Sequence, residues 1–249
     1  MIRWLLRILS AAAWVCIFIV TVWWTVLIAL VFLLHPLLDP DRRFCHRLAG
    51  GWGRNLIRLA PGSRVELQGE ERIPRDRPAI FLANHQSYVD VPLLFRVPAQ
   101  FKWMADEGLF QVPVLGWAMR MAGYISVRRG DARNGFRSLE RAKGWLARGI
   151  SIFVFPEGTR SHTGMLGRFQ TGAFRLAVST RTPIVPVVVV GTRQLLPRDS
   201  WVFRWGVRLK IRILASVRPE DFASPRELAR HVRKRMRDEY ARVLTCRVP

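Results

Sequence analysis

The chain has 249 residues, and its 40 Lys and Arg against 18 Asp and Glu give a formal net charge of +22. Half of the residues are hydrophobic, with 10 Trp and 14 Phe, which excludes a disordered or low-complexity chain. The length suits one α/β domain with appendages. The three cysteines, Cys16, Cys45 and Cys246, do not suit a disulfide framework or a zinc quartet, which indicates a reducing compartment. The charge predicts an anionic partner: nucleic acid, an anionic membrane surface or a phosphorylated substrate.

The N-terminal segment is apolar, with no Asp, Glu, Lys or Arg from Ile8 to Leu38. At ~1.5 Å per residue, a helix of this length would exceed the ~30 Å hydrocarbon core of a bilayer. The run is too long for the apolar region of a cleaved signal peptide. Two paths are open, a single tilted span or a hairpin that enters and leaves the same leaflet. Tryptophan prefers the membrane interface, and because Trp23 and Trp24 lie near the middle of the run, we favour the hairpin-like or interfacial anchor.

Residues 42–60 form a basic segment in which apolar residues recur at nearly helical spacing. The apolar positions are Phe44, Leu48, Trp52, Leu56 and Leu59, and the basic ones are Arg42, Arg43, Arg47, Arg54 and Arg58. We expect the Trp and Leu side chains in the acyl boundary and the arginines on anionic headgroups, each contributing about 1 kcal/mol. The alternative is an ordinary helix that covers the sheet with a solvated basic face. Residues 1–60 are therefore predicted to be a membrane-anchoring helical segment, and residues 61–249 an α/β domain in the cytoplasm.

Strand-like and helix-like segments alternate after the break at Pro61 and Gly62. The predicted strands are residues 65–68, 78–83, 123–127, 150–155 and 184–190, and the predicted helices are residues 90–96, 114–121, 134–147 and 172–179. The strands are mostly continuous apolar runs, which is typical of strands buried on both faces. This order predicts an α/β fold with a mostly parallel mixed sheet covered by helices.

The last third of the chain predicts one more strand and a closing helix. In residues 202–217 the charges of Arg208, Lys210 and Arg212 alternate with apolar residues, which predicts an antiparallel strand with one basic, exposed face. Residues 224–227, Ser-Pro-Arg-Glu, match a capping box with Pro at the first helical position. One apolar stripe follows at helical spacing, formed by Leu228, Val232, Met236, Tyr240 and Val243. We expect this helix to dock on the domain through that stripe.

Residues 84–90, Asn-His-Gln-Ser-Tyr-Val-Asp, directly follow the predicted strand 78–83. Ligands of open α/β sheets collect at the carboxyl ends of strands, which is where His85 is expected. Asp90 lies five residues later, so a turn entering a helix would bring its carboxylate to one imidazole nitrogen and leave the other free to take a proton from a hydroxyl. A loop-capping pair without catalytic function is the alternative. The chain has no Gly-x-Ser-x-Gly elbow, which favours direct attack by a hydroxyl of the substrate.

Three further segments lie at predicted strands. Residues 153–161, Phe-Val-Phe-Pro-Glu-Gly-Thr-Arg-Ser, make a sharp turn in which Arg160 offers a planar fork suited to phosphate, with Glu157 placed to orient it or to bind a substrate hydroxyl. Residues 123–129 bring Arg128 and Arg129 to the same sheet edge. Residues 184–186, Ile-Val-Pro, place a proline in a buried run, which marks a bulge or a strand start. The alternative for residues 153–161 is a strand-ending turn with a surface salt bridge.

These segments, in this order and spacing, resemble the motifs of the glycerolipid acyltransferases. Residues 84–90 match the N-H-x4-D motif, residues 123–129 resemble the second block, residues 155–161 the third and residues 184–186 the apolar fourth. Residues 169–172 resemble a Phe-Lys-x-Gly segment with Gln in place of Lys. The resemblance covers about residues 78–191. It is strongest to the bacterial 1-acyl-glycerol-3-phosphate acyltransferases, which make phosphatidic acid and carry a short membrane-binding N-terminus before an α/β domain.

The resemblance implies a role for each matching residue. His85 would be the general base on the free glycerol hydroxyl, and Asp90 would hold its tautomer and stabilise the imidazolium. The substrate-binding residues would be Asn84, Lys102, Arg129, Glu157, Gly158, Thr159 and Arg160, with Lys102 adding a cation to the phosphate site. The partners would be a lysolipid acceptor in an anionic membrane and an acyl-CoA or acyl-carrier protein donor. No metal, no cofactor and no acyl-enzyme are implied, and the protein would lie at the inner membrane with its catalytic domain facing the cytoplasm.

The sequence departs from the family pattern beside the presumed phosphate site. Ser126 stands where an apolar or aromatic residue is usual, and Arg128 stands where an acid is often found. Relatives with nearly the same motifs acylate lyso-ornithine lipid or other lysolipids, so the acceptor stays open between these and 1-acyl-glycerol-3-phosphate.

Two other classes of function are alternatives for this sequence. One is a basic, non-catalytic membrane-surface protein, which leaves residues 84–90 and 155–161 without a function. Because the basic residues are dispersed and no nucleic-acid module is found, we expect no nucleic-acid partner. The other is an acyl hydrolase in which Ser87 is the nucleophile. We expect Ser87, two residues from His85 on a tight turn, to be a helix cap or a hydrogen-bond partner instead.

Overall fold

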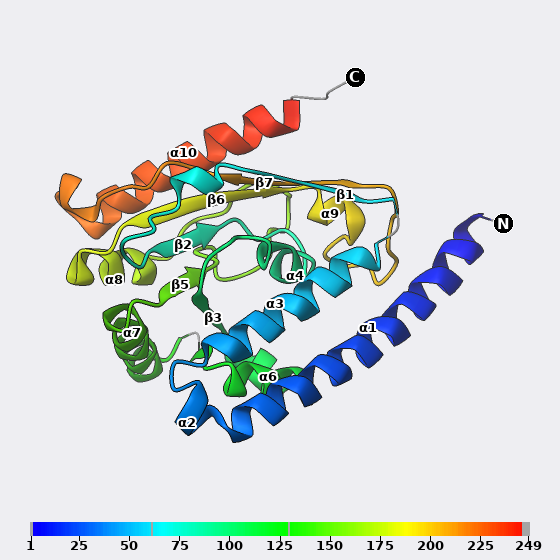
Figure 1. Cartoon of the computed structure of the whole chain (residues 1–249). Helices are drawn as coiled ribbons and strands as arrows, with labels where there is room; N and C mark the ends of the chain where they lie inside the picture. The colour runs from blue at the N-terminus through cyan, green and yellow to red at the C-terminus, as the bar shows by residue number, and fades with distance from the viewer. Residues whose placement is uncertain (1, 61, 129, 246–249) are drawn as a thin grey trace.

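The structure is a computed structural model that describes residues 2–60, 62–128 and 130–245 (Figure 1). Its centre is a seven-stranded sheet in the order β1 (Arg64–Gln68), β7 (Arg208–Ile213), β6 (Ile184–Val190), β2 (Ile80–Ala83), β5 (Ser151–Val154), β3 (Phe101–Asp106) and β4 (Ile125–Val127). The five strands from β6 to β4 run parallel, whereas β7 is antiparallel to β6 and parallel to β1. The predicted mostly parallel mixed sheet is confirmed.

Helices cover both faces of the sheet (Figure 1). One face carries α7 (Ala132–Ala147), α8 (Gly172–Thr180) and α10 (Pro225–Thr245), and the other carries α1 (Ile2–Leu33), α3 (Arg43–Arg58), α4 (Asp90–Leu94) and α6 (Leu115–Met121). Short elements complete the chain: α2 (His35–Leu38), η1 (Glu70–Arg72), α5 (Glu107–Gln111), α9 (Thr192–Leu195) and η2 (Pro219–Asp221).

The central strands are apolar on both sides because both sides are covered. On β2, Ile80 and Leu82 belong to the core beneath α7, α8 and α10, whereas Phe81 belongs to the core on the α3 and α4 side. All three side chains are fully buried. This double burial removes the polar alternation of a half-exposed strand and explains the continuous apolar runs in the sequence.

Strand β3 is missing from the sequence prediction, and the exposed face predicted for β7 is wrong. Residues 101–106 include Lys102 and Asp106, which obscure the apolar run of a buried strand. In β7, Lys210 is buried, and Arg212 is largely buried with its guanidinium 3.8 Å from Glu66 of β1. The reason is that Leu209 and Ile211 lie in the core on the α3 and α4 side, so Lys210 points to the opposite face of the sheet, which helices also cover.

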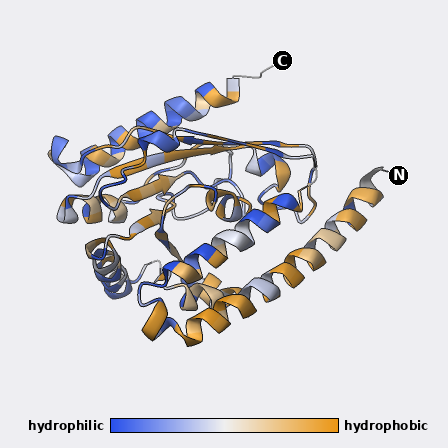
Figure 2. Ribbon diagram, in the orientation of Figure 1, coloured by the Kyte–Doolittle hydropathy of each residue, from blue (hydrophilic) through white to orange (hydrophobic). Residues whose placement is uncertain are grey.

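The N-terminal anchor has a different path from the predicted one. Helix α1 is continuous from Ile2 to Leu33, so there is no bend at Trp23 and Trp24. A hairpin is nevertheless formed, because the chain turns within residues 34–42 and α3 runs back beside α1 (Figure 1). Within the described residues, α1 is the helix long and apolar enough to cross a membrane, judged by length and composition alone. Figure 2 shows its hydrophobic colouring continuing into α2.

Helix α3 packs against α1 and α4, while Phe44 is exposed and Trp52 is half-buried. A Cβ at Gly51 would come within 2.2 Å of the Trp24 ring on α1, and a Cβ at Gly53 within 2.8 Å of the Pro92 carbonyl on α4. The indole of Trp52 donates to Thr21 Oγ1 at 3.0 Å. The glycines therefore allow three helices to approach closely, and the packing of α3 on the domain agrees with the alternative of a helix that covers the sheet. Its contact with a membrane stays a prediction. The boundary predicted at residue 60 stays a prediction.

Helix α10 matches its prediction. The backbone N–H of Glu227 donates to Ser224 Oγ at 3.2 Å, and Glu227 Oε2 accepts from the N–H of Ala223 at 3.1 Å, so the capping box forms. The apolar stripe of the helix is buried in the core, and hydrophilic residues alternate with it along the helix (Figure 2).

Candidate active site

The side chains of His85 and Asp90 meet at the carboxyl end of β2. His85 lies in the turn after β2, and Asp90 begins α4. His85 Nδ1 is 2.8 Å from Asp90 Oδ2, which also accepts the backbone N–H groups of Gln86 at 2.6 Å and Ser87 at 2.8 Å. Asp90 is fully buried, and the His85 side chain is 15% exposed. The three contacts on one carboxylate oxygen orient the Asp90 side chain, which in turn fixes the imidazole with Nε2 as its outward nitrogen.

The third block of the sequence supports the His85 turn from the end of β5. The Phe155 ring stacks on the imidazole at 4.0 Å between centroids. Glu157 Oε1 accepts the backbone N–H of His85 at 2.9 Å, and its Oε2 accepts the N–H of Gly167 at 2.7 Å. Burial raises the pKa of Glu157, opposed by these two hydrogen bonds. Both oxygens are thus used to position backbone, which differs from the predicted substrate-binding role.

Two polar residues of the first block are occupied by backbone. Asn84 Nδ2 donates to the Val189 carbonyl at 2.9 Å, and Asn84 Oδ1 accepts the Val189 N–H at 2.8 Å, so the buried amide ties β2 to β6. This geometry contradicts the predicted substrate-binding role of Asn84, because its amide is already paired. Ser87 Oγ donates to the Leu196 carbonyl at 2.7 Å and accepts from the N–H of Val89 at 3.3 Å. Ser87 is therefore the predicted hydrogen-bond partner, buried and turned away from a nucleophilic role.

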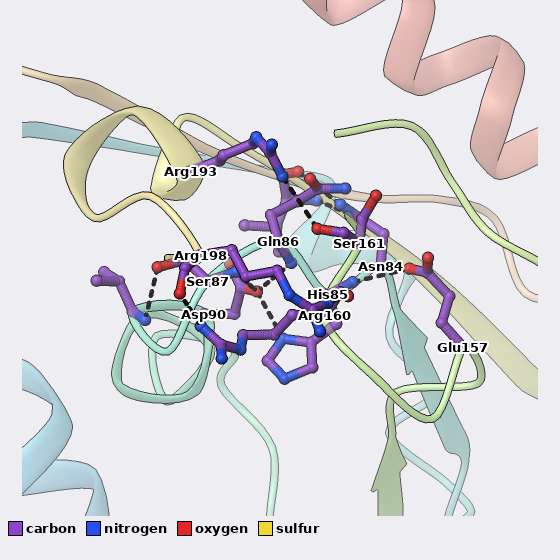
Figure 3. Close-up of polar contacts among 12 residues, drawn as sticks. Asn84, His85, Gln86, Ser87, Asp90, Glu157, Arg160, Ser161, Arg193 and Arg198 are labelled. Atoms are coloured by element: carbon purple, nitrogen blue, oxygen red, sulfur yellow. Dashed lines mark hydrogen bonds and ion pairs between the residues drawn. The ribbon is translucent and has the colours of Figure 1, made fainter. Parts of the chain in front are cut away.

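Arginines from two loops gather around His85 (Figure 3). Arg160 Nη1 donates to the Arg198 carbonyl at 2.9 Å, and Arg198 donates in return to the Arg160 carbonyl. The Arg160 guanidinium lies over the Tyr88 ring, 3.8 Å from its centroid. Arg193 donates to the carbonyls of Ser161 and His162 at 3.0 and 2.8 Å. The arginines after β6 thus clamp the loop after β5 and make the rim of the site cationic.

Of the remaining residues predicted for substrate binding, Gly158 and Thr159 lie in the turn after β5. Gly158 has φ +71°, a conformation that favours glycine, and completes the turn after β5. Thr159 is exposed beside Arg160. Arg129 lies outside the described residues.

Lys102 does not lie at this site. It sits near the amino end of β3, opposite Ile152 of β5, whereas His85 follows the carboxyl end of β2. Its Nζ donates to the carbonyls of Arg42 at 2.9 Å and Ala122 at 2.8 Å, and the side chain is fully buried. Burial lowers the pKa of Lys102 to about 7, although Asp39 and Cys45 oppose the shift. The prediction that Lys102 adds a cation to the phosphate site is wrong.

Comparison with known proteins agrees with this geometry. The model of the acyltransferase family matches residues 64–190, which contain the dyad, Glu157 and Arg160. The chain belongs to the acyltransferase family. It is 39% identical to the chloroplastic 1-acyl-sn-glycerol-3-phosphate acyltransferase LPAT1 of Arabidopsis thaliana over 71% of this chain and 50% of that one. It is 35% identical to the 1-acyl-sn-glycerol-3-phosphate acyltransferase of Saccharomyces cerevisiae over 74% of this chain and 62% of that one.

A solved structure is similar over the full length of this chain. The crystal structure of the 1-acyl-sn-glycerophosphate acyltransferase PlsC from Thermotoga maritima superposes with a TM-score of 0.86 at 27% identity, covering 100% of both chains. The first curated relatives are longer proteins, and the chain spans about half of their length. The N-terminal helices and the α/β sheet are thus part of a shared fold.

The structure also shows candidate site residues that the sequence patterns did not single out. Arg193 and Arg198 follow β6, the strand next to β2, just as Arg160 follows β5. The same rule that placed His85, that ligands collect at the carboxyl ends of parallel strands, would have singled them out. Within residues 2–60, 62–128 and 130–245, no group of three His, Cys, Asp or Glu side chains is placed to hold a metal ion.

Proposed function

We propose that this protein transfers a fatty acyl group from an acyl thioester to the free hydroxyl of a lysophospholipid. The observation that carries the proposal is the His85–Asp90 pair, in which Asp90 occupies Nδ1 and leaves Nε2 at the outward side of a partly exposed ring. A carboxylate on Nδ1 fixes the tautomer of the ring and balances the charge of the imidazolium that forms during the reaction. A loop-capping pair would not need a histidine side chain that reaches the surface.

The reaction follows from this geometry. As the acceptor hydroxyl oxygen attacks the thioester carbonyl, its proton passes to His85 Nε2 and a new C–O bond forms. Asp90 balances the positive charge on the ring. When the tetrahedral intermediate collapses, the C–S bond breaks and the imidazolium returns the proton to the leaving thiolate. No side chain of the protein is acylated, which agrees with the buried, hydrogen-bonded position of Ser87.

The acceptor is proposed to carry a phosphate, with 1-acyl-glycerol-3-phosphate as the substrate and phosphatidic acid as the product. Arg160 and Arg198 lie beside the dyad, and a guanidinium fork suits phosphate oxygens. The curated relatives named above are 1-acyl-sn-glycerol-3-phosphate acyltransferases, which supports the same acceptor. Lyso-ornithine lipid is the second candidate; it has no phosphate and would offer these arginines only the carboxylate of its ornithine.

Membrane association is proposed through the helical hairpin of α1 and α3. The outward face of α1 is exposed and apolar from Trp4 to Leu33, which is far more apolar surface than a water-soluble monomer carries. The inward face is fixed to the domain, because Trp14 Nε1 donates to the Trp201 carbonyl at 2.8 Å and Ser10 Oγ accepts from the N–H of Phe203 at 2.9 Å. A helix attached in this way supports an anchor in one leaflet, with the remainder of the chain at the cytoplasmic surface of the inner membrane.

The test is acyl transfer by purified protein in neutral detergent micelles. A labelled acyl-CoA and the matching acyl-carrier protein are each supplied with 1-acyl-glycerol-3-phosphate, other lysophospholipids or lyso-ornithine lipid. We expect transfer to 1-acyl-glycerol-3-phosphate that is lost in His85→Ala and kept in His162→Ala, a histidine with an exposed side chain outside the dyad. Transfer to lyso-ornithine lipid alone would overturn the acceptor and keep the chemistry. Equal activity of His85→Ala and the wild type would overturn the mechanism.

A further inference from the structure

A second cationic feature lies on the β4 edge of the sheet, away from the dyad. It is a groove of about 740 Å³ between the α2–α3 linker, α6, β4 and α7. In the strand order, β4 is three strands from β2, which carries His85 at its end. None of the residues that line the groove belongs to the His85–Asp90 pair or to the arginine rim around it. The volume is within the ~300–1,000 Å³ range of ligand sites.

The charge of this groove is strongly positive. Its charged lining residues are Arg42, Arg120, Arg141, Arg148 and Glu107. Glu107 is already paired with Arg128, whose Nη2 is 3.1 Å from its Oε1. Of the lining arginines, Arg148 pairs with Asp41 next to the groove. Arg120 and Arg141 form no ion pair with any described residue, and both side chains are exposed.

Room for a ligand is left where α7 lines the groove. A Cβ at Gly144 would meet no heavy atom within 4 Å, so the position is open space. The neighbouring Trp145 forms an aromatic wall, with the Arg148 guanidinium 5.0 Å and Lys102 Nζ 4.8 Å from its ring centroid. At Gly123, which has φ +75°, the missing side chain allows Arg42 and Trp145 to come together, since a Cβ there would lie 3.0 Å from both.

The groove begins next to the most exposed apolar residues of the hairpin. Leu37 and Leu38 on α2 are 84% and 75% exposed, and Pro40 and Arg42 line the groove. At most roughly 14 Å of chain separates Leu38 from Arg42. Leucines this exposed are suited to the acyl region of a bilayer, and the headgroup region above it is on the order of 5–8 Å deep. Leucines inserted in this way would bring Arg42, at the mouth of the groove, to the level of the lipid phosphates.

We propose that this groove is a separate binding site for the phosphate of an anionic phospholipid headgroup, with Arg120 and Arg141 as its principal ligands and the exposed leucines of α2 beside the acyl chains. The arginines supply forks that match phosphate oxygens, and the open position at Gly144 admits the headgroup. The site would add a second contact with the membrane to the one proposed for the apolar face of α1.

Calorimetric titration of the full chain in neutral detergent micelles tests the site. The probes are short-chain phosphatidylglycerol, short-chain phosphatidylcholine with the same acyl chains, and inorganic phosphate. We expect saturable binding of phosphatidylglycerol at one site per chain, with phosphatidylcholine and inorganic phosphate much weaker. The double variant Arg120→Gln with Arg141→Gln should weaken phosphatidylglycerol binding roughly tenfold or more.

Matched control variants distinguish an effect of the groove on lipid binding from an effect of net charge or of misfolding. Arg226→Gln with Arg230→Gln removes the same charge from exposed positions of α10 and should leave binding unchanged. Gly144→Leu fills the groove and keeps every arginine, so it should also weaken binding, whereas Gly135→Leu on the same helix, where a Cβ likewise meets nothing, should not. Equal weakening by the α10 variant would overturn the proposal in favour of net charge.

Other outcomes contradict the proposal in distinct ways. If Arg160→Gln abolished phosphatidylglycerol binding, the lipid would be bound in the active site and not in the groove. If inorganic phosphate bound as tightly as the lipid, the ligand would be free phosphate. If the groove variants bound lipid normally and instead raised KM for acyl-carrier protein but not for acyl-CoA, the groove would dock the donor protein. His85→Ala should bind phosphatidylglycerol normally, so failure here is independent of the proposed reaction.

Discussion

A buried ionisable side chain lies at each end of the sheet, Asp90 at one and Lys102 at the other. Their hydrogen-bond partners differ in kind. At the carboxyl ends of the strands, Asp90 accepts three donors on one oxygen, and its partner His85 keeps Nε2 on the outward side of a partly exposed ring. Near the amino end, the ammonium of Lys102 donates to two carbonyls and is fully buried. The difference teaches that a buried ionisable pair can act on a substrate only where one of its atoms, here His85 Nε2, is left without a partner among the described residues.

The covering elements create this difference. At the carboxyl ends, the loops after β2, β5 and β6 turn outward and leave a rim of arginines around His85 (Figure 3). At the other end, the start of α3 closes over β3, and the carbonyl of Arg42 is one of the acceptors for Lys102. Arg42 adopts φ +54° to make this turn, a conformation in which few residues other than glycine are found.

The largest effect on activity is expected when the His85–Asp90 pair loses the negative charge of Asp90. Asp90→Asn keeps an oxygen that can accept from the imidazole and the two backbone N–H groups, but it removes the negative charge opposite the imidazolium. We expect kcat to fall by about 10²–10³-fold, measured by steady-state acyl transfer. Thermal unfolding of the variant should resemble that of the wild type. Wild-type kcat in Asp90→Asn would contradict the role of the pair.

A smaller effect is expected at the cationic rim. Arg160→Gln removes the guanidinium over Tyr88 and, on the proposed function, a phosphate ligand. Loss of a charge-assisted hydrogen bond should raise KM for the phosphate-bearing acceptor roughly tenfold or more, with KM for the acyl thioester unchanged. The measurement is a pair of saturation curves, one for each substrate. An unchanged acceptor KM would show that the phosphate binds elsewhere.

At Lys102, near the amino end of β3, the expected effect is on stability and its pH dependence. Because burial lowers the pKa of Lys102 to about 7, the unfolded chain binds a proton at this residue between pH 7 and its ordinary pKa, while the folded chain does not. The free energy of unfolding should therefore rise with pH above about 7, by roughly 1.4 kcal/mol per pH unit from this residue.

The measurement for Lys102 is a comparison of thermal unfolding in detergent at pH 6, 7.5 and 8.5. Wild type and Lys102→Met should differ in pH dependence: the difference in stability between them should stay constant below pH 7 and shift in favour of the wild type as the pH rises above 7. Parallel curves for the two proteins would show that Lys102 keeps its ordinary pKa in the fold.

The smallest effect is expected for Glu157→Gln. The carboxylate accepts the backbone N–H groups of His85 and Gly167, and an amide can accept only one of them. Loss of one hydrogen bond, on the order of 1 kcal/mol, should lower kcat about fivefold without changing KM for either substrate. A rise in acceptor KM with unchanged kcat would instead restore the substrate-binding role that the sequence suggested for Glu157.

Local sequence patterns were sufficient for much of the fold and for the centre of the site. The continuous apolar runs of β2, β5 and β6 correctly predicted a largely parallel sheet, because strands buried on both faces carry little polar alternation. The spacing of His85 and Asp90 correctly predicted their contact, because five residues of a tight turn leave few other arrangements. Strand β3 was missed, since Lys102 interrupts its apolar pattern.

The positions of the arginines, of Lys102 and of the N-terminal hairpin are decided by contacts between distant parts of the chain. Arg198 reaches Arg160 across 38 residues, and Lys102 is satisfied by the carbonyl of Arg42, 60 residues earlier. In the hairpin, α3 packs closely on α1 because Gly51 has no side chain where the Trp24 ring lies. The spacing of apolar residues along the chain does not predict this contact. Periodicity and spacing record only neighbours along the chain, whereas hydrogen-bond partners and close packing depend on which elements the sheet brings side by side.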